Sequence, residues 1–284
     1  MYVPVSVVVP CYCCEDTIER AVVSVMSQTA LPAEVILVDD ASTDHGRTLS
    51  KLQELQERFR DKTHTHIEII ALKNNGGPSV ARNAGWETAT QPYIAFLDAD
   101  DAWHPQKLEI QYGYMCNFPD VVMTGHDWIV RRRDDSFVDD ILPQKWKIKY
   151  ISKWRFILIS KYFITPTVMV KRSVVHRFPC DLRYAEDRFL WLEIISDNNK
   201  AAYIDLPLTY LFKAPYGDAG LTRNIFAMEK GELVGFTRLY DMKLINLIEF
   251  TIGFSFSLIK FIRRFVKVTI RRISNTSWSH IESF

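Results

Sequence analysis

Two aspartates, Asp98 and Asp100, follow directly on an apolar run from Tyr93 to Leu97. Such a run is typical of a parallel strand that helices cover on both faces, and open α/β sheets bind their ligands at the carboxyl ends of these strands. On an extended backbone the two carboxylates point the same way, and their repulsion favours a cation between them. Oxygen ligands of this kind suit Mg²⁺ or Mn²⁺ that bridges to phosphate. The alternative is a polar turn in which Asp101 caps a following helix.

The elements that position these aspartates alternate between strand and helix. Predicted strands cover residues 5–9, 35–38, 67–72 and 93–97, and predicted helices cover residues 17–28, 46–60 and 79–90. This alternation indicates an α/β fold with a mostly parallel, doubly wound sheet and helices on both faces. With right-handed connections, polar residues after successive strands meet at one edge of the sheet. They are Pro10, Tyr12, Asp40, Arg82, Asp98 and Asp100.

This edge lacks the glycine patterns of two common nucleotide sites. No Gly-x-Gly-x-x-Gly follows the first strand, and no Gly-x-x-x-x-Gly-Lys-Ser/Thr occurs in the chain, so neither a dinucleotide site nor a P-loop is supported. Phosphatases with an aspartate nucleophile need a Thr or Val shortly after the second Asp of the pair, whereas Asp101-Ala102-Trp103 follows here. A metal ion and side chains are left to neutralise phosphate.

Composition and charge narrow the class of protein further. The chain of 284 residues is 48% hydrophobic, which is enough for a full core. Its net charge is +1, but the segment from Thr251 onward carries +5 and the rest −4. This balance disfavours nucleic acid as a partner and indicates that the tail alone meets an anionic surface. The five cysteines lack the spacing of a zinc site or a disulfide framework, which favours a reducing, cytoplasmic compartment.

Four motifs within residues 5–103 carry a family resemblance. They are Val5-Ser-Val-Val-Val-Pro-Cys-Tyr12, Val38-Asp-Asp-Ala-Ser-Thr-Asp44, Gly76-Gly-Pro-Ser-Val-Ala-Arg-Asn-Ala-Gly85 and Phe96-Leu-Asp-Ala-Asp-Asp-Ala-Trp103. In order and spacing they resemble the signatures of the inverting family 2 glycosyltransferases, which have the GT-A fold. One departure is Cys13, where the family usually has Asn after the Tyr.

The resemblance implies a site for a nucleotide-sugar. By it, Pro10 and Tyr12 line the base pocket, Asp40 contacts the uracil of a UDP-sugar, Asp98 lies near the ribose and Arg82 lies beside the donor. Asp100, with Asp98 as a second ligand, would hold Mn²⁺ or Mg²⁺ at the diphosphate. For Asp39, a donor contact and a cap on the turn both stay open.

A second acidic pair, Glu186 and Asp187, opens a predicted amphipathic helix whose inward residues are Leu190, Trp191, Ile194 and Ile195. Acids in a first helical turn are favoured by the helix dipole, so the pair alone is an ordinary helix start. In the family an Asp of the corresponding Glu-Asp pair is the general base, and Asp187 matches it. Glu186 is the next candidate.

Residues 210–224 resemble the loop that closes over the donor in many family members. Lys213 and Arg223 are the predicted phosphate contacts, and Gly217 and Gly220 are the predicted hinges. Relatives often have Arg near Lys213, and a plain surface loop is the alternative.

The tail from Phe256 to Ile273 has two faces. At 100° per residue one face gathers Lys260, Arg263, Arg264, Lys267 and Arg271, and the opposite face gathers Leu258, Ile259, Ile262, Phe265, Val266 and Ile273. A basic amphipathic helix indicates contact with an anionic membrane surface, and the apolar run upstream is shorter than a membrane span. A helix docked on protein is the alternative.

We therefore expect a metal-dependent inverting glycosyltransferase, hexosyl- or N-acetylhexosaminyl-transferring, that acts in cell-surface glycan synthesis. Residues 1–105 would bind the UDP-sugar, residues 106–225 would bind a lipid-linked or polysaccharide acceptor, and residues 226–284 would form helices that associate with the inner face of the cell membrane. The alternative is a catalytically inactive nucleotide-sugar-binding or scaffold protein.

Overall fold

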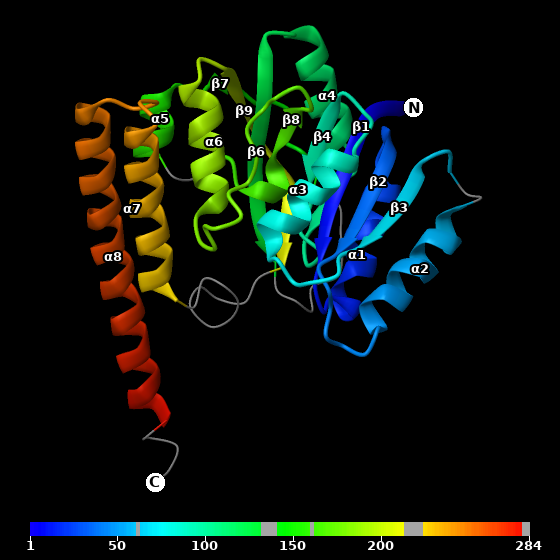
Figure 1. Cartoon of the computed structure of the whole chain (residues 1–284), viewed down its shortest axis with the longest axis horizontal. Helices are drawn as coiled ribbons and strands as arrows, with labels where there is room; N and C mark the ends of the chain where they lie inside the picture. Colours follow the sequence, from blue (N-terminus) through cyan, green and yellow to red (C-terminus); the bar gives the residue numbers. More distant parts are fainter. Residues whose placement is uncertain (61–62, 132–140, 160–161, 213–223, 280–284) are drawn as a thin grey trace. The chain divides into compact units, whose positions relative to one another are not determined.

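The computed structural model of the chain describes residues 1–60, 63–131, 141–159, 162–212 and 224–279 (Figure 1). The chain divides into two compact units, Met1–Lys213 and Ala214–Phe284. The strands of the first unit are β1 (Tyr2–Cys11), β2 (Leu31–Asp39), β3 (His66–Ala71), β4 (Tyr93–Phe96), β5 (Ala102–Trp103), β6 (Val121–Arg131), β7 (Ile148–Tyr150), β8 (Met169–Lys171) and β9 (Lys200–Phe212). Its helices are α1 (Glu15–Met26), α2 (Arg47–Arg60), α3 (Pro78–Thr88), α4 (Lys107–Asn117), α5 (Lys153–Leu158) and α6 (Glu186–Ser196), with a 3₁₀ turn at Thr165–Thr167.

In the described part of the first unit the strands form one sheet in the order β3-β2-β1-β4-β8-β6-β9-β5, and β7 pairs with β9. The first four strands are parallel to one another, so their carboxyl ends share one edge, as the sequence predicts. β8 is antiparallel to both β4 and β6, whereas β6 and β9 are parallel. The sheet beyond β4 is therefore mixed, and the residues before β8 come to the same edge as the residues after β4.

Helices cover both faces of this sheet because alternate residues of each strand face opposite ways (Figure 1). Val5, Val7 and Val9 of β1 belong to a core with apolar residues of α1, α2 and α4. Val8 points to the other face, where it meets α3. On that face a cluster of four rings, Trp86, Phe96, Phe178 and Trp191, joins α3, β4 and α6.

The structure differs from the sequence-based expectation for two elements of the second half of this unit. The long strand β9 extends to Phe212 and so includes the first residues of the loop predicted at 210–224. α6 is buried nearly all round rather than amphipathic, because α5, the sheet and the ring cluster surround it.

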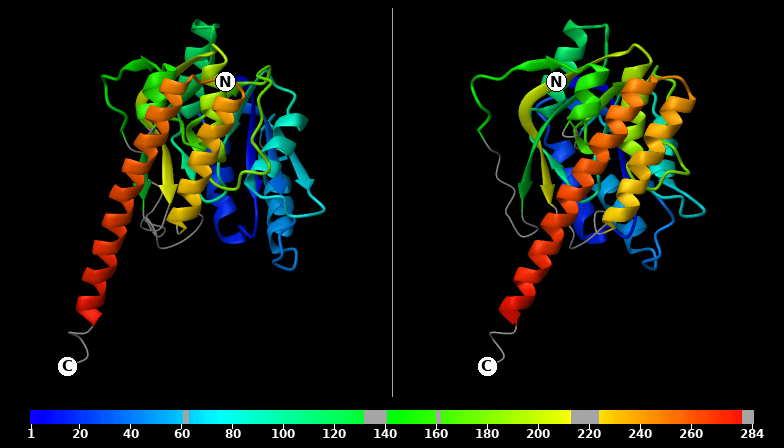
Figure 2. Two further views of the ribbon diagram at one scale, coloured as in Figure 1. Left: turned by 60° about the vertical axis from the view of Figure 1, so that its left-hand side comes forward. Right: turned by 90° about the vertical axis from the view of Figure 1, so that its left-hand side faces the viewer.

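The second unit contains α7 (Ile225–Asp241) and α8 (Leu247–Ser279), which lie side by side and run in opposite directions (Figure 2). Both begin at an asparagine cap: Asn224 Oδ1 accepts the N–H of Ala227, and Asn246 exchanges two hydrogen bonds with Glu249. Among the residues that the structure describes, none of the helices combines the length and hydropathy that a membrane crossing requires.

A close approach between α3 and the sheet generates the first testable prediction. A Cβ added to Gly85 would lie 2.4 Å from Val8 Cγ1 and 3.2 Å from Val38 Cγ2, whereas a Cβ added to Gly113 of α4 meets nothing within 4 Å. Gly85→Ala should therefore lower the free energy of unfolding by about 1–3 kcal/mol through overpacking. The control Gly113→Ala should raise it by up to about 1 kcal/mol through helix propensity. Urea unfolding measures both, and a Gly85→Ala protein as stable as the control would contradict the packing assigned to α3.

Candidate active site

The aspartates after β4 lie on a turn, not on the extended backbone that their spacing suggested. The N–H of Asp101 donates to the carbonyl oxygen of Asp98 at 3.1 Å, and this turn brings the carboxylates of Asp98, Asp100 and Asp101 within 4.8 Å of one another. The alternative of Asp101 as a helix cap is wrong: its Oδ1 accepts the N–H of Phe212 at 3.1 Å, and α4 begins only at Lys107. The turn thus gathers one more carboxylate than the sequence analysis assigned.

This aspartate cluster fits a hard divalent cation. Its three carboxylates offer only oxygen ligands, Asp101 is fully buried, and Asp98 and Asp100 are half-buried and so open to a ligand. The turn is held from outside by Arg20, whose guanidinium donates to the carbonyl oxygen of Asp100 at 2.6 Å. Oxygen donors with room for phosphate and water are the coordination that Mg²⁺ and Mn²⁺ take.

The loops after β1 and β2 are hydrogen-bonded to each other at the same edge of the sheet as this cluster. The N–H of Cys13 donates to Ser42 Oγ at 2.9 Å, and the hydroxyls of Tyr12 and Thr43 lie 3.4 Å apart. Tyr12 is 49% exposed, which leaves its ring available to a flat ligand, and Pro10 is the penultimate residue of β1. The two residues predicted at a base pocket therefore lie at the edge where the aspartates lie.

Asp39 and Asp40 each hold a turn in this structure. Asp39 Oδ1 accepts both the N–H and the hydroxyl of Ser42. The carboxylate of Asp40, only 3% exposed, accepts the N–H groups of Gly76 at 2.8 Å and Gly77 at 2.7 Å, which fixes the start of α3. Carboxylate oxygens keep a second lone pair, so contact of Asp40 with uracil stays a prediction.

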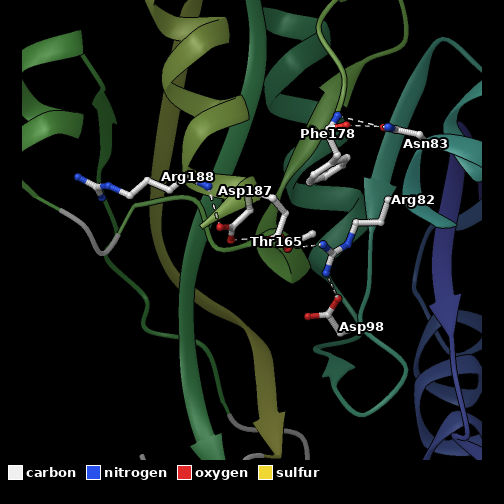
Figure 3. Close-up of polar contacts among 8 residues, drawn as sticks. Arg82, Asn83, Asp98, Thr165, Phe178, Asp187 and Arg188 are labelled. Atoms are coloured by element: carbon white, nitrogen blue, oxygen red, sulfur yellow. Dashed lines mark hydrogen bonds and ion pairs between the residues drawn. The ribbon is translucent and has the colours of Figure 1, made fainter. Parts of the chain in front are cut away.

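Arg82 connects the aspartate cluster to α6. Its side chain is 7% exposed, and it donates to Asp98 Oδ1 at 2.8 Å from one nitrogen and to Glu186 Oε1 at 3.1 Å from another (Figure 3). The backbone nearby is held by Asn83, whose side-chain amide exchanges two hydrogen bonds with the backbone of Phe178. Both ion pairs of Arg82 therefore lie inside the protein and not on its surface.

The environments of Glu186 and Asp187 differ, which separates their chemistry. Glu186 is 8% exposed and paired with Arg82; burial and the neighbouring Asp187 charge raise the pKa of Glu186 to about 7. Asp187 is half-buried, and its Oδ2 accepts the hydroxyl of Thr165 at 3.3 Å (Figure 3). Ala185 before them has the left-handed φ of 58°, which is strained for a residue with a Cβ and turns both acids toward the site.

Some residues of the site were predicted but fall outside the described chain, and one was not predicted. Lys213 and Arg223, predicted to contact phosphate, lie outside the described residues, as do Gly217 and Gly220. Thr165, whose hydroxyl bonds to Asp187, was not among the predicted site residues. The feature that could have identified Thr165 is its position, because its hydroxyl lies just before β8, a buried strand that runs antiparallel beside β4.

Comparisons with known proteins agree with this geometry. Residues 6–178 match the family described as Glycosyl transferase family 2. Over 197 residues, which are 67% of this chain and 71% of the relative, the chain is 32% identical to the putative teichuronic acid biosynthesis glycosyltransferase TuaG of Bacillus subtilis. Over 199 residues, 70% of this chain and 72% of the relative, it is 32% identical to the UDP-Glc:alpha-D-GlcNAc-diphosphoundecaprenol beta-1,3-glucosyltransferase WfgD of Escherichia coli.

Among solved structures, the fold is similar to that of S. aureus TarS 1–349 in complex with UDP-GlcNAc. The TM-score is 0.63 at 20% identity, with 83% of this chain and 66% of that chain covered. The chain spans 39% of the longer TarS chain that it also matches. This likeness confirms the predicted GT-A architecture.

The buried Glu186 generates a prediction about stability. Its pKa of about 7 exceeds the ordinary 4.5, so the folded protein holds this proton more tightly than the unfolded chain does. The stabilisation is fully present below pH 4.5 and is lost as pH rises toward 7, at up to about 1.4 kcal/mol per pH unit. Relative to Glu186→Gln, which cannot ionise, the wild type should therefore lose stability between pH 5 and pH 8 in urea unfolding.

The control for this measurement is Glu19→Gln. Hydrogen bonds from Lys51 and Arg58 hold the pKa of Glu19 below its usual range, so its titration lies under the window tested. Wild type and Glu19→Gln should show parallel stability profiles between pH 5 and pH 8. Parallel profiles for wild type and Glu186→Gln would show instead that Glu186 is ionised throughout.

Proposed function

The chain belongs to glycosyl transferase family 2, and from this membership we propose that it transfers a sugar, a hexose or an N-acetylhexosamine, from a UDP-sugar to a lipid-linked or polysaccharide acceptor with inversion at the anomeric carbon. The observation that carries the proposal is the buried link from Asp98 through Arg82 to Glu186. It sets a cation-binding acidic turn and a candidate general base at one edge of one sheet.

The donor occupies the edge formed by the loops after β1, β2 and β4. Its uracil lies against Pro10 and Tyr12 with Asp39 and Asp40 beside it, its ribose lies near Asp98, and Lys213 and Arg223 meet its phosphates from beyond the described residues. UDP is supported as the nucleotide by the names of two similar proteins: WfgD uses UDP-Glc, and TarS was solved with UDP-GlcNAc.

Asp100 and Asp98 hold the divalent cation, Mn²⁺ or Mg²⁺, with Asp101 next to them. A cation held there would supply positive charge against the diphosphate leaving group. Arg82 keeps Asp98 in place with a bond of 2.8 Å, so the metal-binding turn does not depend on the cation alone for its shape.

Asp187 is the general base. It takes the proton of an acceptor hydroxyl while that oxygen attacks the anomeric carbon, and UDP leaves from the opposite side of the sugar ring. Thr165 orients the base by donating its hydroxyl to Oδ2. Glu186 is unsuited to this role because it is buried and bonded to Arg82.

The acceptor half and the tail determine what the sugar is transferred to and where in the cell the reaction takes place. WfgD acts on a sugar linked to diphosphoundecaprenol, a lipid, and TuaG is named for the synthesis of a surface polymer. Residues 106–225 thus receive a saccharide on a lipid or on a growing glycan, while residues 226–284 hold the catalytic domain, residues 1–225, to an anionic membrane surface from the cytoplasmic side. The protein is peripheral at the inner face of the cell membrane.

Asp100→Ala tests the metal site. The variant should lose the metal-dependent part of UDP binding, about tenfold or more in affinity, because the cation loses a ligand. The fold should persist, since Arg20 bonds the backbone carbonyl oxygen of Asp100, which the substitution keeps. Calorimetric titration of UDP with and without Mn²⁺ measures the effect. The control is Asp120→Ala, because Asp120 lies at the opposite edge of the sheet and pairs with Lys200. This variant should keep the metal-dependent part of UDP binding. Unchanged metal dependence in Asp100→Ala removes this residue from the site.

Asp187→Asn tests the base. The amide keeps the shape but cannot take a proton, so transfer should fall by roughly 10²-fold or more while UDP-sugar binding stays. Release of UDP in the presence of a lipid-linked acceptor is the assay, with a panel of UDP-sugars. Asp197→Asn, at the other end of α6, is the matched control. Transfer near the wild-type rate would place the base elsewhere, and a wild type that neither transfers nor hydrolyses any donor with Mn²⁺ would favour the inactive binding protein.

A further inference from the structure

α8 turns its charged side toward α7. Ser257 donates to Glu229 at 2.9 Å, Lys260 pairs with Glu232 at 2.7 Å, and Arg264 lies 3.0 Å from Glu229 and 3.6 Å from Glu232. The two glutamates are only 5% and 8% exposed, so these pairs are inside the hairpin. Two cations of the basic face that was predicted to meet a membrane are therefore paired within the second unit.

The opposite side of α8 is apolar and exposed. Its exposed residues, with their exposed fractions, are Leu247 60%, Ile248 65%, Ile252 40%, Leu258 38%, Ile259 62%, Ile262 60%, Phe265 43% and Val266 47%. Spacings of three and four residues put them along one side of the helix, and we call them the apolar row. A helix of a water-soluble protein buries its apolar side and exposes its charges, and α8 does the reverse.

Small residues let the charged side approach α7. A Cβ added to Gly253 would lie 2.5 Å from the ring of Phe236, so this ring of α7 packs directly against the backbone of α8. One turn further along, Ser257 is fully buried and bonded to Glu229. Contact by way of Gly253, Ser257, Lys260 and Arg264 fixes the rotation of α8 about its own axis.

We propose that Glu229 and Glu232 orient α8 so that the apolar row enters the interface of a lipid bilayer, and that apolar contact, more than attraction to anionic lipid, holds the protein there. The inference rests on the membrane role in the proposed function. It adds that the apolar row is the surface that meets the membrane and that apolar contact is the main attraction. From Ile248 to Val266 the row extends about 27 Å along the helix, which suits a helix that lies in the interface plane.

The chemistry of the row favours lipid over a second protein as its occupant. The row follows a single convex helix, and a bilayer accepts such a shape without complementary pockets. Arg263 is exposed beside the row, where its long side chain reaches lipid headgroups. The reported acceptor of WfgD is itself attached to a membrane lipid, so an interfacial helix would bring enzyme and acceptor to one surface.

The test compares flotation of full-length proteins with neutral phosphatidylcholine vesicles and with vesicles that also contain phosphatidylglycerol. Wild type should float with both, even at high salt. Ile259→Ser/Ile262→Ser should partition about tenfold or more weakly to both, since two exposed apolar side chains no longer enter lipid. The control Ile141→Ser/Val175→Ser removes two apolar residues of the first unit that are even more exposed, 99% and 79%, and should float like wild type.

Glu229→Gln/Glu232→Gln separates orientation from attraction. Without the acids, Lys260 and Arg264 lose these two carboxylate contacts and the hold on the rotation of α8 weakens, so flotation should fall on neutral vesicles and persist on anionic ones. Flotation equal to wild type on both would overturn the role of the glutamates. A wild type that floats only with anionic lipid at low salt would overturn apolar attachment.

Two further measurements complete the test. Sedimentation shows whether the apolar row binds lipid or a second copy of the chain, and nucleotide binding reports on the donor site separately from the tail. Sedimentation without lipid tests a second copy as the occupant: a wild-type dimer that Ile259→Ser/Ile262→Ser dissociates, with no flotation of either, would overturn the proposal. Metal-dependent UDP binding in the same preparations tests the donor site separately. Its loss with normal flotation would count against the proposed function alone.

Discussion

The rest of the site depends on the double ion pair of Arg82. A buried guanidinium is tolerated only when its charge is matched, and here one match comes from the turn after β4 and the other from the start of α6. Removing one partner of such a buried pair costs about 3–5 kcal/mol because the other charge is left unmatched. The pair therefore ties the half proposed to bind the donor to the half proposed to carry the base, and the edge-to-face ring contacts of Phe178 with Trp86 and Trp191 hold α3 and α6 close enough for it to form.

The arrangement of the first four strands was predictable because it depends on local sequence. Uninterrupted valines and isoleucines identify strands covered on both faces, the helical segments between them require parallel pairing, and parallel pairing puts the polar residues after each strand at one edge. The structure confirms this fold. The roles of the residues at that edge came from motif resemblance, not from the pattern, and they stay predictions.

The features that escaped prediction all join residues far apart in the chain. Asp101 looked like a helix cap because its partner, the N–H of Phe212, lies 111 positions further along the sequence. Thr165 belongs to the site only because β8 returns beside β4. The two faces of α8 were evident from periodicity, yet which face turns inward depends on Glu229 and Glu232 of another helix.

The insertion of β8 between β4 and β6 has a consequence for how the chain acquires its structure during synthesis. Strands β1 to β4 and the helices between them are complete once residue 96 has been made, and they pair with near neighbours in sequence. Closure of the sheet waits for β8 and β9, and the bond from Phe212 to Asp101 forms only at the end of β9. Distant pairings of this kind slow folding. We expect a nascent chain to order the edge after β1, β2 and β3 early and to complete its acidic turn last, while the end of β9 is still being made.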